Sequence, residues 1–121
     1  MPVEIQRRYN FDAAHRLEGL EPEHPCARLH GHRFCVDVVL RGDVDSRGMV
    51  CDFRELDRRL KPLIERLDHA YLNEIEGLSQ PTVENLAVWF ARHLPELPAP
   101  LAAIRVWESE RAYAEWRPEK T

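Results

Sequence analysis

Three histidines in this chain have a spacing that suits a metal site: His15, His30 and His32. His30 and His32 flank a glycine in a stretch of alternating residue types. In a β-strand, residues two apart point to the same face, with Cα atoms about 6.6–6.8 Å apart. His15 ends an earlier alternating stretch. If the two stretches pair as antiparallel strands, His15 meets the other two, and three neutral imidazoles form a site suited to zinc.

The alternation also predicts which face carries these histidines. One face of the second stretch is largely apolar after its two histidines, with the order His30, His32, Phe34, Val36, Val38 and Leu40. One face of the first stretch holds Val3, Ile5, Tyr9, Phe11, Ala13 and His15, interrupted only by Arg7. An isolated histidine beside apolar residues is usually a packing residue, but a third one in matching register favours ligation. His24, in a loop bracketed by prolines, and His93, near a helix C-terminus, lack that support.

Cys26 precedes His30 by four residues, in the loop that enters the histidine strand. As a fourth ligand it would close a Cys-His₃ tetrahedron and give a structural zinc site. As a free thiolate near a cation it would have a lowered pKa and act as a base or nucleophile. The residues alone leave both roles open. Cys35 and Cys51 are expected to be packing residues.

Two further groups could take part in chemistry. Asp68 precedes His69 at the end of an expected helix, and a carboxylate beside an imidazole can orient it for proton transfer. The alternative is an ordinary surface pair. Glu108 ends an apolar row on an expected strand, where a carboxylate is costly to desolvate without partners. A guanine or pterin edge would offer two donors to it, whereas a frayed strand end would leave it in water.

The periodicities predict the order β-β-α-α-β-β. After a loop over residues 17–29, the second strand ends near Arg41, and a short extended piece precedes the first helix. Asp52 is the expected N-cap of this helix, with Glu55 as its capping-box partner, and Pro62 predicts a kink or a break. The second helix begins after Thr82 and stops before Pro95, and strands follow over 101–109 and 112–117.

This pattern is typical of an α+β fold with two helices on one face of a four-stranded antiparallel sheet. Two long outer strands would leave open edges, so we expect oligomerisation through strands. The 121 residues suffice for a single domain, 1–121. Three cysteines without a disulfide-scaffold spacing, and no apolar signal segment, indicate a cytoplasmic protein.

Composition narrows the range of partners. The chain is 44% hydrophobic and 31% charged, as globular domains usually are, and it has no stretch long enough to span a membrane. Its formal net charge is −4, with no basic run longer than two residues, which argues against nucleic acid as a partner. A small anionic ligand needs only a few local arginines and remains compatible.

With these residues assembled, the chain resembles the 6-pyruvoyltetrahydropterin synthase and 6-carboxytetrahydropterin synthase family. The resemblance rests on F-D-A-A-H-R-L, C-A-R-L-H-G-H-R-F, G-M-V-C-D-F-R-E-L, L-D-H-A-Y-L-N, P-T-V-E-N-L-A and the glutamate of V-W-E-S. These segments occur in order and cover nearly the whole chain. The short C-x-x-x-H-G-H spacing is similar to the bacterial 6-carboxy-5,6,7,8-tetrahydropterin synthase branch of queuosine biosynthesis. The C-terminal S-E-R-A-Y-A-E-W-R-P-E-K-T lacks the small residues expected after the anchoring glutamate.

The resemblance implies the tunnelling fold (T-fold), whose subunits join edge to edge into trimers or dimers of trimers with active sites between subunits. By position, it implies Zn²⁺ ligands at His15, His30 and His32, and a catalytic Cys26 that does not bind the metal. Asp68 and His69 would be the proton-transfer pair, and Glu108 the pterin anchor. We add Arg16 and Arg28, which flank the histidines, as candidates for binding a triphosphate.

The implied reaction converts 7,8-dihydroneopterin triphosphate to 6-carboxytetrahydropterin, acetaldehyde and triphosphate. Two alternatives stay open. The same fold could make the 6-pyruvoyl product of tetrahydrobiopterin synthesis, or cleave sepiapterin-like substrates as a side reaction. The chain could instead be a non-catalytic, zinc-stabilised pterin-binding oligomer.

Overall fold

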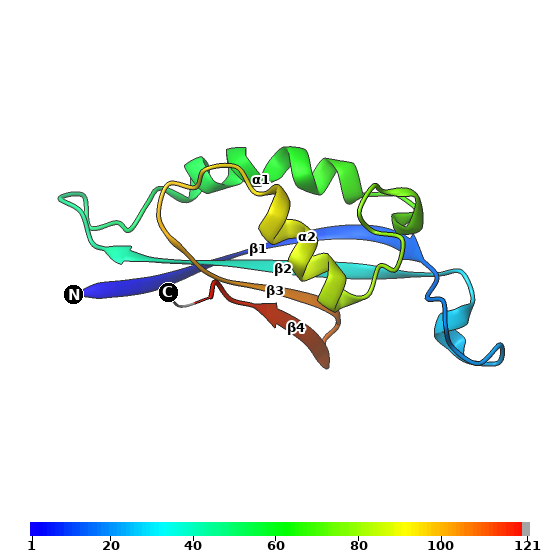
Figure 1. Ribbon diagram of the computed structural model, residues 1–121. Coiled ribbons are helices and arrows are strands. Elements are labelled where there is room, and N and C mark those ends of the chain that lie inside the picture. The colour runs from blue at the N-terminus through cyan, green and yellow to red at the C-terminus, as the bar shows by residue number, and fades with distance from the viewer. Residues whose placement is uncertain (120–121) are drawn as a thin grey trace.

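The computed structural model of the chain describes residues 1–119, and it has the predicted β-β-α-α-β-β order. The elements are β1 (Pro2–His15), β2 (His30–Asp43), α1 (Phe53–Leu67), α2 (Val83–His93), β3 (Leu101–Ser109) and β4 (Ala112–Trp116), with short 3₁₀ turns at Pro25–Ala27 and Leu72–Glu74. The strands form one antiparallel sheet in the order β1-β2-β3-β4. Both helices cover the same face of this sheet (Figure 1). The predicted α+β architecture is confirmed.

The core lies between that face of the sheet and the two helices. Strand alternation supplies one side of it from the central strand β2, where every second residue is fully buried: Phe34, Val36, Val38 and Leu40. The apolar stripes of the helices supply the other side, with Leu56, Leu60, Leu63 and Leu67 from α1 and Leu86, Ala87, Trp89 and Phe90 from α2. Because the row in β2 begins with His30 and His32, the same packing that forms the core also orients the histidines.

The first helix begins as predicted but differs in detail. The Asp52 side chain caps it by accepting a hydrogen bond from the Arg54 N–H at 2.9 Å. The Glu55 carboxylate pairs with Arg58 at 2.8 Å rather than with the Asp52 N–H, so the expected capping box does not close. The extended piece expected before the helix is instead irregular, with bends at Val50 and Cys51 and no strand pairing, and Phe53 is already the first residue of α1.

The helix also runs unbroken through Pro62, so the expected break is wrong. Pro62 lies on the exposed side of the helix. Water can therefore satisfy the carbonyl four residues earlier, which a proline cannot reach with a hydrogen bond.

The two outer strands are unequal, so the expectation of two long edges is wrong for one of them. β1 has 14 residues and β4 has only five. The pairing of β4 with β3 is irregular between Trp107 and Ser109. Pro118, which has no N–H to donate, follows two residues after the last residue of β4.

The segment after α1 covers the end of the long edge. The His69 N–H donates to the Asp12 carbonyl at 2.6 Å, and the Ala14 N–H donates to the Ala70 carbonyl at 3.0 Å. The Asp12 N–H donates to the Asp68 carboxylate at 2.9 Å. These bonds fix Asp68 and His69 beside the last residues of β1.

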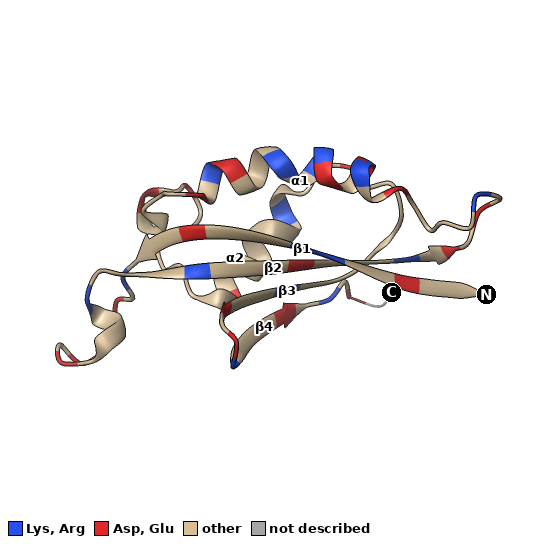
Figure 2. Cartoon of the chain, turned by 180° about the vertical axis from the view of Figure 1, so that it is seen from behind, with Lys and Arg blue, Asp and Glu red and all other residues tan. Residues whose placement is uncertain are grey.

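Charged residues of both signs are interspersed over the surface. Figure 2 shows acidic and basic positions following one another along α1, where Lys61 lies 3.9 Å from Glu65 one turn later. Such exposed pairs contribute little to stability but keep the surface mixed in charge. Among residues 1–119, the structure contains no helix with the length and apolar character needed to cross a membrane.

The cap of α2 offers a direct test of the helix boundary. The Thr82 hydroxyl accepts a hydrogen bond from the Asn85 N–H at 3.1 Å. We expect Thr82→Ala to lower the free energy of unfolding by about 1 kcal/mol, measured by urea denaturation, because it leaves that N–H without its partner. Thr82→Ser keeps the hydroxyl and should stay closer to the original protein. Equal losses in both variants would contradict the cap.

A second prediction concerns the contact that ties α1 to β1. The Asp57 carboxylate accepts from the Tyr9 hydroxyl at 2.7 Å and from the Arg7 guanidinium at 3.1 Å. The pKa of Asp57 is lowered, chiefly by the Tyr9 hydrogen bond. Its stabilisation is therefore present above the unfolded-state value, about 3.9, and is lost as the pH falls through the lower folded value.

We therefore expect Asp57→Asn to unfold at lower urea concentration than the original protein at pH 7. The gap between the two midpoints should shrink as the pH is lowered below about 4, where the unfolded state takes up a proton, until Asp57 is neutral in the folded state as well. A gap that is the same at pH 3 and pH 7 would contradict a charged Asp57 in the folded state.

Candidate metal centre and active site

The three predicted histidines meet at one end of the β1–β2 pair. His15 lies directly opposite His30, and His32 lies opposite Ala13, so the register expected from the sequence is confirmed. The ring centroid of His15 lies 4.5 Å from that of His30 and 5.2 Å from that of His32. The centroids of His30 and His32 are 4.8 Å apart. One ring nitrogen from each histidine lies within 4.8 Å of the other two. The cluster could therefore hold a metal ion.

Hydrogen bonds to backbone carbonyls set the tautomers of two of these rings. His15 Nδ1 lies 2.8 Å from the Pro81 carbonyl, and His30 Nδ1 lies 2.6 Å from the Arg28 carbonyl. A carbonyl only accepts, so each Nδ1 carries the proton and each Nε2 keeps its lone pair. Metal-binding histidines are usually oriented in this way by a second hydrogen bond.

The buried Nε2 of His15 provides the test of whether a metal fits. His15 is 1% exposed, and its Nε2 has no hydrogen-bond partner in the described chain. A buried polar atom without a partner is costly and rare in native structures. A cation bound by the three rings would satisfy this nitrogen, and neutral imidazoles are borderline ligands of the kind that zinc accepts.

Burial keeps the cluster in the form that binds metals. Burial is the main cause that lowers the pKa of both His15 and His32, and the neighbouring His30 lowers the pKa of each further. The ring of Phe34 lies edge-on to both, with centroids 5.4 Å away. The Phe34 ring therefore shields one side of both imidazoles from water, which favours their neutral, unprotonated form.

Glu108 contributes the negative charge near this cluster. Its carboxylate raises the pKa of His15 and of His32, opposing the effect of burial. Glu108 falls at the irregularity between Trp107 and Ser109, where it has no partner in β4. A bulge of this kind re-aims a side chain and is common beside active sites. Glu108 is half-buried, and no hydrogen bond to it occurs within residues 1–119, so its carboxylate is free to accept donors from a ligand.

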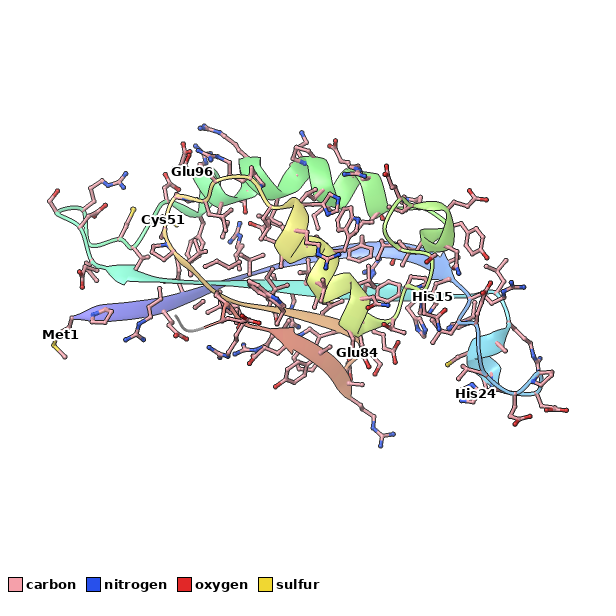
Figure 3. The ribbon with its side chains drawn as sticks, in the orientation of Figure 1. Met1, His15, His24, Cys51, Glu84 and Glu96 are labelled. Atoms are coloured by element: carbon pink, nitrogen blue, oxygen red, sulfur yellow. The ribbon has the colours of Figure 1, made fainter. Side chains whose placement is uncertain are left out.

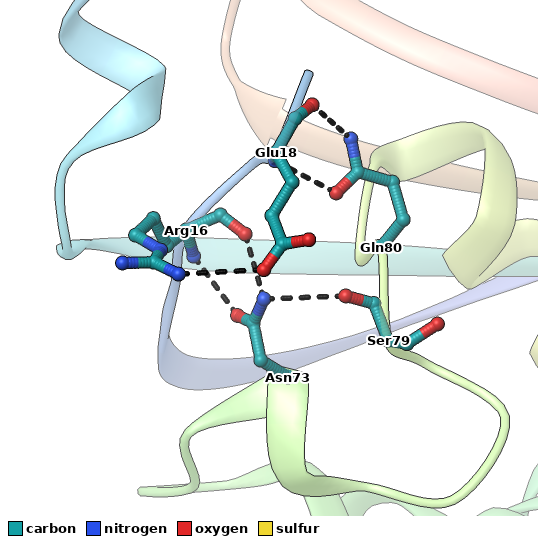
Figure 4. Close-up of polar contacts among 5 residues, drawn as sticks. All are labelled: Arg16, Glu18, Asn73, Ser79 and Gln80. Carbon is teal, nitrogen blue, oxygen red and sulfur yellow. Dashed lines mark hydrogen bonds and ion pairs between the residues drawn. The ribbon is translucent and has the colours of Figure 1, made fainter. Parts of the chain in front are cut away.

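The chain after His15 is held in place by two side-chain amides (Figure 4). Asn73 accepts from the Arg16 N–H at 2.9 Å and donates to the Arg16 carbonyl at 2.7 Å. Gln80 makes the same pair of bonds with the backbone of Glu18, both at 2.9 Å. Each amide thus makes the two hydrogen bonds that a neighbouring strand would make, and it satisfies both the N–H and the carbonyl of one residue. Together they fix the exit from β1, at which His15 lies.

Cys26 lies in the 3₁₀ turn of the loop that connects the two histidine strands, and its side chain is half-buried. The Leu17 N–H donates to the Cys26 carbonyl at 2.8 Å, which ties this turn to the exit from β1. The Cys26 sulfur is not part of the cluster formed by the three histidine nitrogens. Figure 3 shows His15 at the end of β1 near the start of α2, and His24 out in the connecting loop.

Asp68 and His69 form the expected pair. His69 Nδ1 lies 3.1 Å from the Asp68 carboxylate, and the His69 side chain is 81% exposed. His69 has a positive φ of 59°, the left-handed conformation that follows a helix end. A hollow of about 480 Å³ is lined by His69 and His32 together with Asp12 and Arg33. The structure therefore brings His69 and one histidine of the cluster to the same hollow.

The two arginines proposed for phosphate binding have different surroundings. The Arg16 guanidinium is half-exposed and lies 3.3 Å from Glu18, which a phosphate would have to displace. Arg28 is exposed and its carbonyl accepts a hydrogen bond from His30, whereas its guanidinium makes no hydrogen bond or ion pair within the described chain. Arg28 is thus the freer of the two charges.

Several supporting groups could not be recognised from the sequence. The Pro81 carbonyl, Asn73 and Gln80 position His15 and the chain after it, yet no pattern marks which backbone they bond. Asp12 was not singled out from the sequence, although its backbone holds Asp68 and His69. The only signal in the sequence is the presence of three amide side chains in and after the segment that follows α1, at Asn73, Gln80 and Asn85.

A four-stranded antiparallel sheet with two helices on one face, and with histidines clustered at the end of its first strand pair, defines a T-fold protein. The chain belongs to the 6-pyruvoyl tetrahydropterin synthase family, whose model matches residues 4–119. It is thus an enzyme of the pterin synthase class.

Similar proteins agree with this assignment. The chain is 40% identical over 112 residues to a 6-carboxy-5,6,7,8-tetrahydropterin synthase of Synechocystis, covering 87% of this chain and 85% of that protein. It is 36% identical over 111 residues to a dihydroneopterin monophosphate aldolase of Pyrococcus furiosus, covering 89% and 91%. The solved structure of the Caenorhabditis elegans 6-pyruvoyl tetrahydropterin synthase superposes with a TM-score of 0.87 at 27% identity, covering 98% and 97%.

The metal centre can be tested apart from activity. We expect one zinc per chain by elemental analysis. His32→Ala should lose more than the roughly 10–100-fold in zinc affinity that removal of an outer partner costs, because it removes a ligand. His93→Ala removes an exposed histidine outside the cluster and is the control. Equal zinc affinity in the two variants would exclude the three-histidine site.

Proposed function

We propose that this protein is a zinc-dependent 6-carboxy-5,6,7,8-tetrahydropterin synthase of 7-deazapurine (queuosine) biosynthesis. Its substrate would be 7,8-dihydroneopterin triphosphate. With one water, the products are 6-carboxytetrahydropterin, acetaldehyde and triphosphate. The water balances the reaction, because the first side-chain carbon stays on the ring as the carboxylate while the other two carbons leave as acetaldehyde.

One observation carries the metal-dependent part of this proposal: the buried His15 Nε2 that has no partner among the described residues. His15, His30 and His32 would hold the zinc. When bound, zinc supplies Lewis-acid polarisation of the side-chain oxygens of the substrate. Because the Cys26 sulfur does not belong to the histidine cluster, the fourth position would stay open for the substrate.

The remaining residues would bind the ring and move protons. Glu108, half-buried and free of protein partners in the described chain, would accept hydrogen bonds from the amine-and-amide edge of the pterin. Cys26, as thiolate, would take a proton from one side of the substrate side chain. His69, oriented by Asp68 at 3.1 Å, would serve the other side. Arg16 and Arg28 would bind the triphosphate.

We also propose that the active unit is a homo-oligomer, either a trimer or a dimer of trimers. Along β1 the N–H groups of even-numbered residues face outward, since those of Asp12 and Ala14 bond to the segment after α1. Earlier in the strand, the outward N–H groups of Glu4, Gln6 and Arg8 have no backbone hydrogen-bond acceptor within residues 1–119. An unpaired edge of this length is a template for another strand. The short β4 of a second copy is the matching edge.

Product identity distinguishes this reaction from its relatives. Incubation of the zinc-loaded protein with 7,8-dihydroneopterin triphosphate should give 6-carboxytetrahydropterin by mass spectrometry, with acetaldehyde trapped as its hydrazone. A 6-pyruvoyl product would support the tetrahydrobiopterin reaction instead. Turnover of the monophosphate alone would favour the aldolase activity named for the Pyrococcus relative. No turnover of either substrate would leave a zinc-stabilised pterin-binding oligomer.

The role of Cys26 can be separated from metal binding. We expect Cys26→Ala to lower kcat by about 10²–10⁴-fold, the range for loss of a group that transfers a proton, while zinc stays at one per chain. Cys35→Ala, which removes another half-buried thiol, is the matched control and should retain activity. Loss of zinc from Cys26→Ala would instead support a closed structural site.

A further inference from the structure

His24 makes a contact that its place in a proline-rich loop did not predict. Its ring Nδ1 accepts a hydrogen bond from the backbone N–H of Cys26 at 3.0 Å. His24 is the N-cap of the 3₁₀ turn Pro25–Ala27 that carries Cys26, with extended φ and ψ of −65° and 131°. The ring thus takes the position that Ser, Thr, Asp or Asn usually occupies at a helix start.

The position of Pro25 makes this one bond matter. Pro25 is the first residue of the turn and has no N–H, so Cys26 supplies the first free donor. The turn itself is closed by the Ala27 N–H, which donates to the His24 carbonyl at 2.9 Å. His24 therefore holds the turn twice, through its carbonyl and through its ring. Only the ring contact depends on the side chain.

The carbonyl of Cys26 is fixed as well. It accepts the Leu17 N–H at 2.8 Å, two residues after His15. The turn ends at Arg28, whose carbonyl orients His30. Both backbone polar groups of Cys26 are thus bonded, and the bonds lead to the strand ends that carry the histidine cluster. The rotation of the Cys26 peptide units, and with it the direction of the thiol, depends on these two contacts.

We propose that His24 is a positioning residue for the Cys26 thiol, acting as a side-chain cap rather than by touching substrate. This inference rests on the proposed function, in which Cys26 transfers a proton. Accepting at Nδ1 places the ring proton on Nε2, so the cap requires a neutral imidazole. Asn can supply an equivalent acceptor oxygen, whereas Ala cannot.

The test compares His24→Ala with His24→Asn and with Glu23→Ala, an exposed neighbour in the same loop. We expect kcat for 7,8-dihydroneopterin triphosphate to fall about tenfold in His24→Ala, with KM within about twofold. His24→Asn should recover most of the loss, and Glu23→Ala should match the original protein. Hydrogen–deuterium exchange at the Cys26 amide should rise about 2–10-fold in His24→Ala only, the factor that one hydrogen bond supplies.

The two readouts separate this inference from the proposed function. If the original protein has no turnover, or Cys26→Ala keeps it, the proposed function is wrong and a catalytic effect of His24 falls with it. If Cys26→Ala is inactive but His24→Ala and His24→Asn behave alike in both kcat and amide exchange, the positioning role is wrong while the proposed function stands. If kcat differs between His24→Ala and His24→Asn while exchange at the Cys26 amide is the same in both, the capping role is also wrong, because His24 would then affect turnover without holding that amide.

Discussion

The antiparallel register of β1 and β2 is the constraint on which the rest of the structure depends. It places His15 opposite His30 and thereby gathers three rings on one apolar face. A shift of β1 by one residue against β2 would turn the side chains of β1 to the other face, and it would remove Phe11 from the core together with His15 from the cluster. The stacking of Phe11 on Phe34, with ring centroids 5.2 Å apart, therefore stabilises the core and the histidine cluster in the same register.

Burial and hydrogen bonding then adjust the rings for their task. The same packing that stabilises the fold leaves His15 Nε2 desolvated and without a partner in the described chain, a local cost that a bound cation would remove. The carbonyl contacts at Pro81 and Arg28 fix which nitrogen faces the cluster. The loop between the strands carries Cys26 and is tied at both ends, so the thiol is held near the histidine strands without joining their cluster.

Much of this could be predicted from the sequence because it follows from periodicity. Alternation gave both histidine strands and their pairing, and the caps at Asp52 and Thr82 were recognisable from residue type. The effect of Pro62 could not be predicted, since it depends on which side of the helix faces water. The contacts of Asn73, Gln80 and His24 are long-range or loop-specific, and a polar side chain in a loop does not reveal its partner. The short β4 likewise depends on an irregularity that no pattern marks.

The central claim is that three imidazoles hold a metal ion whose remaining position is open and free of sulfur. X-ray absorption at the zinc edge of the zinc-loaded, substrate-free protein measures this directly. The account predicts three imidazole nitrogens and one oxygen at about 2.0–2.1 Å, with no sulfur in the coordination shell. A zinc–sulfur distance near 2.3 Å, or fewer than three imidazoles, would contradict it.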